Sequence, residues 1–215
     1  MNFAIVPVKK FENAKTRLSS ILTLEERIML SSLMLERTLG VLEMVSEVDR
    51  ILLVSTDRRA EQIGLNYDTK FLHEETESGV NSAVMLADSY STSERADATV
   101  VIPQDLPLLN QADVSMVCKL ALNDDRCIVI CPSQRYDGTN ALLRKPPSAI
   151  RTFYDSNSYE SHIAEAASSG VQTRIFLSKN LMSDVDTPDD VKQIMRDDTG
   201  DDNKVIDFLK SKLSA

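Results

Sequence analysis

Three aspartates of this chain lie where predicted strands end. Asp105 follows an apolar run over residues 98–102, and Asp184 and Asp186 flank Val185 in a short segment before a helix start. Alternate side chains of an extended segment project to one side, so the last two carboxylates should face the same way. Hard carboxylate oxygens favour Mg²⁺ over zinc. We therefore predict a magnesium site formed by Asp105, Asp184 and Asp186.

A cationic segment follows the first apolar run. It contains Lys9, Lys10, Lys15 and Arg17 in a chain whose net charge is -9. The segment has no glycine, so the Walker and dinucleotide-binding fingerprints are absent and side chains must bind any phosphate. A solvated basic loop is the alternative. The position after the first strand, where open α/β sheets bind ligands, favours a polyphosphate site.

Two further segments offer contacts to a ligand. Gly79 and Asn81 open a predicted helix, where free backbone amides suit an anion or the edge of a nucleobase. Thr139, which follows a glycine, provides a hydroxyl donor. Ordinary capping or turn chemistry would also explain each of these segments. The histidines, His73 and His162, belong to no clear catalytic pattern, and we assign them no role.

The apolar pattern of the chain predicts an α/β fold. Short apolar runs alternate with longer segments of helical period, which is typical of strands joined by helices. We expect strands at residues 3–8, 51–55, 69–72, 98–102, 127–131, 139–144 and 173–177. We expect helices at residues 23–46, 58–64, 78–91, 111–122, 158–169, 188–196 and 204–213. The length is sufficient for one domain over residues 1–215.

Two local signals refine this arrangement. Asp137 and Gly138 indicate a turn between adjacent strands, so the sheet should be mixed and mostly parallel. Thr23 and Glu26 have the spacing of a capping box at the start of the longest helix. The apolar stripe of that helix is wide, which is typical of core plus subunit contact. We therefore expect a homodimer.

Another helix start follows the last aspartate pair. Thr187 is suited to cap this helix and Pro188 to occupy its first position. Capping would account for Asp189 and Asp190 without any ligand, but it does not explain Asp184.

The overall charge and composition exclude several classes of protein. A net charge of -9 and a pI near 4.8 argue against binding extended nucleic acid, which needs a basic face. No apolar stretch is long enough for a membrane span and the start resembles no signal peptide, so we expect a cytoplasmic protein without membrane partners. The acidic stretch 196–203 fits no calcium motif and should be a solvated turn.

Taken together, five motifs closely resemble those of the 2-phospho-L-lactate guanylyltransferase family, over nearly the whole chain. They are Val6-Pro7-Val8-Lys9, Ala14-Lys15-Thr16-Arg17-Leu18, Pro103-Gln104-Asp105-Leu106-Pro107, Asp137-Gly138-Thr139-Asn140-Ala141-Leu142 and Asp184-Val185-Asp186-Thr187-Pro188-Asp189-Asp190. The resemblance implies a nucleotide-diphospho-sugar transferase-like fold, a three-layer sandwich around the mixed sheet. It also implies a step of coenzyme F-420 biosynthesis in which GTP and 2-phospho-L-lactate give lactyl-2-diphospho-5'-guanosine and pyrophosphate.

The resemblance also suggests roles for individual residues. Asp105, Asp184 and Asp186 would hold Mg²⁺, and Asp105 would act in catalysis together with Lys9, Lys15 and Arg17. The nucleotide would contact Pro7, Val8, Lys9, Lys15, Arg17, Gly79 and Asn81. The acceptor, a small phosphorylated carboxylic acid, would contact Thr139, Asp155 and Ser158. The family often has a Tyr-Gly-x-Gly-Ser stretch for the acceptor phosphate, whereas the aligned residues here are Tyr154-Asp155-Ser156-Asn157-Ser158.

Three alternatives remain open from the sequence. Related bacterial enzymes are described as using phosphoenolpyruvate or 3-phosphoglycerate as the acceptor. A cytidylyl- or molybdopterin-type nucleotidyltransferase would share the fold, although the missing glycine-rich fingerprint counts against it. A nucleotide-binding regulatory domain without catalysis is the alternative from a different class of protein.

Overall fold

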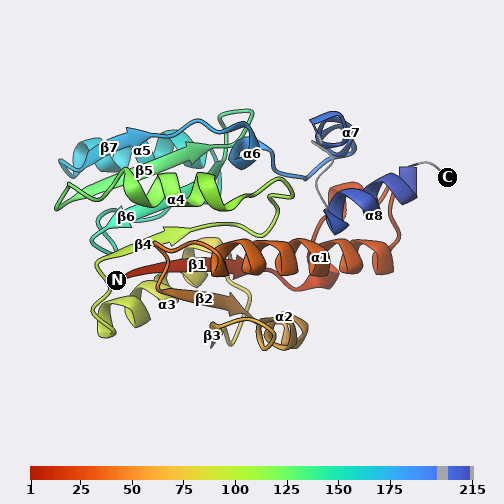
Figure 1. The fold of residues 1–215 in the computed structure, drawn as a ribbon, viewed down its shortest axis with the longest axis horizontal. Coiled ribbons are helices and arrows are strands. Elements are labelled where there is room, and N and C mark those ends of the chain that lie inside the picture. The colour runs from red at the N-terminus through yellow and green to blue at the C-terminus, as the bar shows by residue number, and fades with distance from the viewer. Residues whose placement is uncertain (198–202, 214–215) are drawn as a thin grey trace.

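A computed structural model describes residues 1–197 and 203–213 of the chain. Their strands form one seven-stranded sheet with the strand order β3-β2-β1-β4-β6-β5-β7 (Figure 1). The strands are β1 Asn2–Val8, β2 Arg50–Ser55, β3 Thr69–His73, β4 Ala98–Val101, β5 Cys127–Pro132, β6 Thr139–Lys145 and β7 Gln172–Ile175. The helices are α1 Leu24–Glu43, α2 Arg58–Gly64, α3 Val80–Ser93, α4 Gln111–Lys119, α5 Ser158–Ser168, α6 Lys179–Met182, α7 Pro188–Asp197 and α8 Lys204–Leu213.

The strand order reverses at β1. Strands β2 and β3 extend the sheet on one side of β1, whereas β4 pairs with its other side, and all of these pairs are parallel. Each parallel connection requires a crossover, and α1, α2 and α3 supply the three. Open α/β sheets bind their ligands beyond the carboxyl ends of the strands where the order reverses. The fold therefore predicts a site beyond Val8, the last residue of β1.

Strand β6 runs antiparallel to both of its neighbours, β4 and β5. The mixed sheet expected from the turn at Asp137 and Gly138 is therefore confirmed. Because Val101 at the end of β4 lies opposite Leu142, the start of β6 lies at the same edge as the end of β1. A register shift between Cys131 and Pro132 of β5 interrupts the ladder beside Thr139. Such a bulge can turn neighbouring side chains in different directions.

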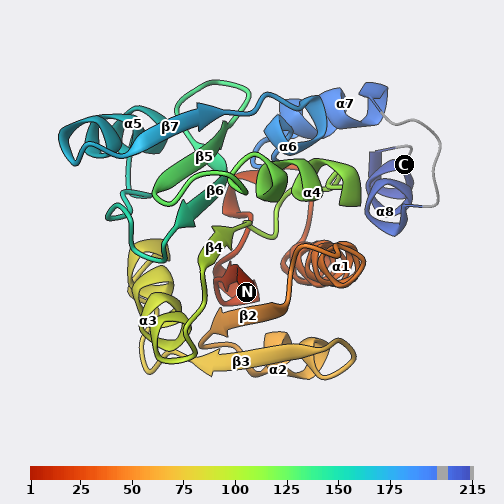
Figure 2. The same cartoon turned by 60° about the vertical axis from the view of Figure 1, so that its left-hand side comes forward.

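Helices cover both faces of the sheet, which confirms the three-layer sandwich (Figure 2). One apolar cluster joins the sheet to α1, α2, α4 and α6, and a second joins it to α3 and α5. The capping box at the start of α1 is present. The Glu26 N–H donates to Thr23 Oγ1 at 3.3 Å, and the Thr23 N–H donates to Glu26 Oε2 at 2.8 Å. The local sequence therefore determines where this helix begins.

A third apolar cluster lies under α7 and α8. Leu30 and Met34 of α1 pack there with Val205 and Leu209 of α8, which runs beside α1 in both views (Figures 1 and 2). The wide apolar stripe of α1 is therefore covered in part by the chain's own helix. The homodimer expected from that stripe stays a prediction.

The expected elements match the observed ones with shifts of a few residues at their ends. The largest shifts shorten two helices, since α1 ends at Glu43 and α4 at Lys119. The sequence interpretation missed α6 and two 3₁₀ turns, η1 Phe11–Asn13 and η2 Thr16–Leu18. Most of the acidic stretch 196–203, expected to be a solvated turn, lies outside the described residues. Within the described part of the chain, every helix is too short or too polar to span a membrane.

Candidate active site

The cationic segment forms a loop with two apolar anchors. Phe11 of η1 and Leu18 of η2 are fully buried, and the side chain of Arg27 in α1 donates to the Ala14 carbonyl oxygen at 2.9 Å. Between the two turns, Lys15 has a left-handed backbone conformation with φ of 52° and ψ of 35°. This conformation is costly for a residue with a side chain, so surrounding contacts must maintain it. The loop is therefore fixed from both ends while it presents Lys15.

The Lys15 ammonium group joins the two aspartate segments. Its Nζ atom lies 2.8 Å from Asp105 Oδ2 and 2.9 Å from Asp186 Oδ1, and only 7% of the side chain is exposed. Burial lowers the pKa of Lys15, but the two carboxylates more than compensate and raise it above its ordinary value. Lys15 is therefore a permanent cation. Burial likewise raises the pKa of Asp186, and Lys15 and Arg17 overcome this so that its pKa is lowered.

Asp184 has a different environment, although it lies two residues from Asp186. Its Oδ1 accepts a hydrogen bond from Asn140 Nδ2 at 3.0 Å, and the same amide donates to the Leu181 carbonyl oxygen at 2.9 Å. Burial and the charge of Asp105 raise the pKa of Asp184 to about 6. The three carboxylates therefore repel one another strongly enough to favour an added cation.

Backbone contacts hold the two aspartate segments together. The N–H of Val185, a fully buried residue, donates to the Asp105 carbonyl oxygen at 3.1 Å. Asp190 Oδ2 accepts from the N–H groups of Asp186 and Thr187, at 3.0 and 2.7 Å. Asp190 therefore acts at the helix start, as the capping interpretation predicts, and it fixes the backbone that carries Asp186.

The donor chemistry of the site is suitable for Mg²⁺. Asp105, Asp184 and Asp186 supply only carboxylate oxygens, which this ion prefers. In the described residues, however, no three side chains of the metal-binding types lie close enough to form a metal-binding group as they stand. Lys15 contacts two of the three carboxylates and supplies the positive charge between them. The metal assignment therefore stays a prediction.

Two hydroxyl groups lie together at the start of β6, next to Asn140, which contacts Asp184. Ser158 Oγ is 3.1 Å from Thr139 Oγ1, and both residues are buried. Thr139 Oγ1 also lies 3.0 Å from Nδ1 of the fully buried His162. The Phe153 N–H donates to His162 Nε2 at 2.9 Å, so the ring proton must be on Nδ1 and must be donated to Thr139. One of the two hydroxyl protons therefore remains free for a ligand.

His162 is a residue that the sequence interpretation missed. Burial and the nearby charge of Arg144 lower its pKa to about 4, so the ring is neutral at physiological pH. It is an orienting group rather than an acid or base. No sequence pattern could have revealed it, because it lies on α5 and acts on a residue at the start of β6.

The loop before α5 connects the hydroxyl pair to α3. Asn157 has the left-handed conformation, with φ of 47°, so it can replace a glycine of the family pattern. Asn81 Nδ2 donates to Asp155 Oδ2 at 3.0 Å, and Asn81 Oδ1 accepts from the Tyr154 N–H at 2.9 Å. Both ends of the Asn81 amide are thus engaged by this loop. Its predicted contact to the nucleotide, like the acceptor contact of Asp155, stays untested.

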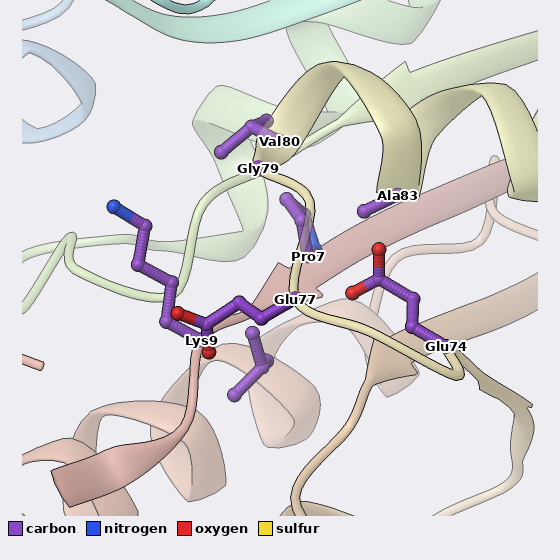
Figure 3. Close-up of a pocket in the computed structure, with 8 residues that line it drawn as sticks. Pro7, Lys9, Glu74, Glu77, Gly79, Val80 and Ala83 are labelled. Atoms are coloured by element: carbon purple, nitrogen blue, oxygen red, sulfur yellow. The ribbon is translucent and has the colours of Figure 1, made fainter. Parts of the chain in front are cut away.

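A pocket opens between the end of β1 and the start of α3 (Figure 3). Four of the predicted nucleotide contacts line it, together with four further residues. The predicted residues are Pro7, Val8, Lys9 and Gly79, and the others are Glu74, Glu77, Val80 and Ala83. Arg17 is not among the lining residues. It is exposed on η2, and its charge acts on Asp186.

A strand-order reversal at β1, a cationic loop and carboxylates at the same sheet edge define a nucleotidyltransferase. Solved nucleotidyltransferase structures share this fold. A nucleotide-diphospho-sugar transferase from Desulfovibrio desulfuricans has a TM-score of 0.80 at 15% identity, covering 99% of this chain and 95% of that one. A nucleotidyl transferase from Methanothermobacter thermautotrophicus has a TM-score of 0.67 at 12% identity, covering 98% and 99%.

The family is shown by sequence. Residues 2–214 match the family described as "Guanylyl transferase CofC like", and the chain belongs to that family. A 2-phospho-L-lactate guanylyltransferase of Methanothermobacter thermautotrophicus is 35% identical, over 89% of this chain and 83% of its own length. A phosphoenolpyruvate guanylyltransferase of Conexibacter woesei is 34% identical, over 88% and 85%. The resemblance found in the sequence motifs is therefore confirmed.

Proposed function

We propose that this protein transfers a guanylyl group from GTP to 2-phospho-L-lactate in the cytoplasm, with Mg²⁺ as cofactor. The products are lactyl-2-diphospho-5'-guanosine and pyrophosphate, and the reaction is a step of coenzyme F-420 biosynthesis. The observation that carries the proposal is the contact of Lys15 with both Asp105 and Asp186, which brings the cationic loop and the two aspartate segments together. Family membership supports guanylyl transfer in particular.

The chemistry is a single displacement at phosphorus. A phosphate oxygen of the acceptor forms a bond to the α-phosphorus of GTP, and the bond from that phosphorus to the leaving pyrophosphate breaks. Both reactants are anions, and each pair of unit charges 4 Å apart costs about 4 kcal/mol at an effective dielectric constant of 20. Lys9, Lys15 and Arg17 offset this repulsion, and no covalent enzyme intermediate is needed. Mg²⁺ held by Asp105, Asp184 and Asp186 would supply further charge neutralisation.

The acceptor is held by hydrogen bonds in this proposal. The hydroxyl pair of Thr139 and Ser158 donates one proton to the acceptor phosphate, since His162 fixes the direction of the remaining bonds. Curated relatives are named for two acceptors, 2-phospho-L-lactate and phosphoenolpyruvate. Phosphoenolpyruvate or 3-phosphoglycerate is therefore the alternative acceptor, and Asp155 near this loop is the departure from the family pattern that bears on the choice.

A product assay tests both substrates at once. GTP, CTP and ATP are each combined with 2-phospho-L-lactate, phosphoenolpyruvate and 3-phosphoglycerate, with and without Mg²⁺, and the pyrophosphate and the coupled product are measured. We expect turnover only with GTP, 2-phospho-L-lactate and Mg²⁺ together. Preferred use of another acceptor would replace 2-phospho-L-lactate in the proposal. Tight nucleotide binding without pyrophosphate release from any pair would favour the regulatory domain instead.

The metal assignment has its own variants. Asp105→Asn and Asp186→Asn should each lower Mg²⁺-dependent turnover by about a hundredfold or more, because each removes a carboxylate ligand of the Mg²⁺ that would neutralise the reacting phosphates. Asp189→Asn is the matched control, since this exposed carboxylate forms its ion pair with Lys192 one turn further along α7. Full turnover in both test variants would refute the metal site.

A further inference from the structure

The position of Glu74 is fixed by the ends of three strands. Its N–H donates to the Ser55 carbonyl oxygen at 3.0 Å, which extends the parallel pairing of β2 and β3 by one residue. Ser55 Oγ in turn donates to the Val8 carbonyl oxygen at 2.8 Å. Glu74 is therefore tied through β2 to the end of β1, the strand that leads into the cationic loop.

The carboxylate of Glu74 faces the β1–α3 pocket and is half-buried (Figure 3). Within the described part of the chain, its oxygens have no hydrogen-bond or salt-bridge partner. Burial, and then the charge of Glu77, raise the pKa of Glu74. Glu77 differs, because it is exposed and its Oε2 accepts from the Lys10 N–H at 2.7 Å. Glu74 is thus a half-buried acceptor without donors, and withdrawing such a group from water without hydrogen-bond partners is unfavourable.

The opposite side of the pocket supplies donors. Helix α3 begins after Gly79, which has φ of 91° and no side chain that could cap the helix. The first backbone N–H groups of α3 therefore lack an intrahelical acceptor. Val80 and Ala83 add apolar surface that suits the face of a planar ring. Acceptors on one side and donors on the other match a flat ligand with a mixed polar edge.

Guanine has such an edge. Its O6 accepts a hydrogen bond, whereas its N1–H and 2-amino group donate, and a carboxylate can accept both of the latter. Adenine and cytosine carry an acceptor in place of N1–H, and uracil lacks the second donor. Hypoxanthine differs from guanine only in lacking the 2-amino group, so it isolates that contact.

We propose that Glu74 selects the base of the nucleotide, by accepting hydrogen bonds from N1–H and the 2-amino group of guanine while the start of α3 donates to O6. This inference rests on the guanylyl transfer proposed above and deepens it. It places the base in the β1–α3 pocket, beside Lys9 at the start of the loop that carries Lys15 to the phosphates. The sequence interpretation had suggested a nucleobase edge at the helix start with Gly79 and Asn81, and it did not include Glu74.

The test compares kcat/KM for GTP and inosine triphosphate, with the same acceptor and Mg²⁺. The wild-type protein should prefer GTP by about tenfold to a hundredfold, the expected value of one hydrogen bond to a charged group. Glu74→Gln should lower kcat/KM for GTP by about the same factor and bring the ratio of the two nucleotides close to one. A general folding defect would lower kcat/KM equally for the two nucleotides. The ratio of the two kcat/KM values therefore reports on recognition of the base alone.

Glu77→Gln and Glu75→Gln are the matched controls. The first neutralises the other pocket carboxylate, and the second neutralises an exposed neighbour that does not line the pocket. Both should keep the wild-type ratio. An unchanged ratio in Glu74→Gln, or a ratio lost only in Glu77→Gln, would overturn the assignment to Glu74. Either result leaves the proposed function intact if the wild-type protein releases pyrophosphate from GTP, whereas no turnover of GTP in the wild type would refute the proposed function itself.

Discussion

Replacing Lys15 with methionine should destabilise the protein and abolish most of its activity. Lys15→Met keeps the length of the side chain and removes its charge. At 2.8 and 2.9 Å, each ammonium–carboxylate contact has a Coulomb energy of about 6 kcal/mol at an effective dielectric constant of 20. Burial of the ammonium group opposes this gain, and the Asp186 side chain is 40% exposed, so solvent screens its share.

The net loss in the free energy of unfolding can be estimated from the ion pairs that Lys15→Met breaks. Removing one partner of a buried ion pair costs about 3–5 kcal/mol, and the exposure of Asp186 places Lys15→Met near the lower value. In urea unfolding without metal, the free energy of unfolding of Lys15→Met should therefore be about 3 kcal/mol below that of the wild type. Added Mg²⁺ should narrow this difference in stability, because Lys15 competes with the ion for the carboxylates in the wild type only. A ligand at a hundred times its dissociation constant would stabilise the folded variant by about 2.7 kcal/mol. Turnover should stay low in Mg²⁺, since the metal would not replace the contact that we propose between Lys15 and the nucleotide phosphates.

Lys10→Met is the control for this prediction. Lys10 lies on the same loop and is exposed, and the residues the structure describes include no partner for its ammonium group. The free energy of unfolding of the control should lie within about 0.5 kcal/mol of the wild-type value, as is usual for substitutions at exposed positions. If Lys15→Met unfolds like Lys10→Met and keeps the wild-type dependence on GTP concentration, Lys15 is not the cation that joins the two aspartate segments.

Two further predictions concern buried charge. Because the pKa of His162 is about 4 in the folded protein and near 6.5 in the unfolded chain, the unfolded chain binds more protons between these values, so stability falls as the pH drops from 6.5 to 4, by up to about 3 kcal/mol. Urea unfolding at pH 7.5 and pH 5 should show a weaker pH dependence in His162→Asn than in the wild type and in the control His73→Asn, and equal dependence in all three would contradict the assignment. Arg144→Met should cost about 3–5 kcal/mol, because it leaves Asp88 without its two hydrogen bonds at 2.6 and 2.7 Å. The double variant Arg144→Met/Asp88→Leu should recover most of that loss in the same assay, and a double variant less stable than Arg144→Met would refute this account.

Features that depend on nearby residues were predictable from the sequence. The capping box of α1 needs only Thr23 and Glu26, and the antiparallel pair β5–β6 needs only the turn at Asp137 and Gly138. The place of Asp105 was predictable because a strand end is a local signal and the carboxyl ends of parallel strands share one edge. Its partner Lys15 was predicted for the phosphates alone, since an ion pair between residues 90 positions apart leaves no trace in either segment.

Features that depend on tertiary packing were not predictable. The orientation of the His162 ring is set by an N–H group on the loop before α5. The position of Glu74 is set by hydrogen bonds that join the ends of β1, β2 and β3. The apolar stripe of α1 has the same appearance in the sequence whether α8 or a second subunit covers it. In each case the sequence specifies the chemical group but not the neighbour that gives it a role.

The apolar cluster under α7 and α8 explains how two irregular loops can hold atoms within hydrogen-bond distance. Leu18 of the cationic loop and Val185 of the carboxylate segment are both buried in it, together with residues of α7 and α8. Lys15 lies three positions before Leu18, and Asp186 directly follows Val185. Neither loop has strand pairing to fix it. The cluster therefore replaces the sheet as the scaffold here, because electrostatic stabilisation of a transition state requires charged groups that are already in place before the reaction.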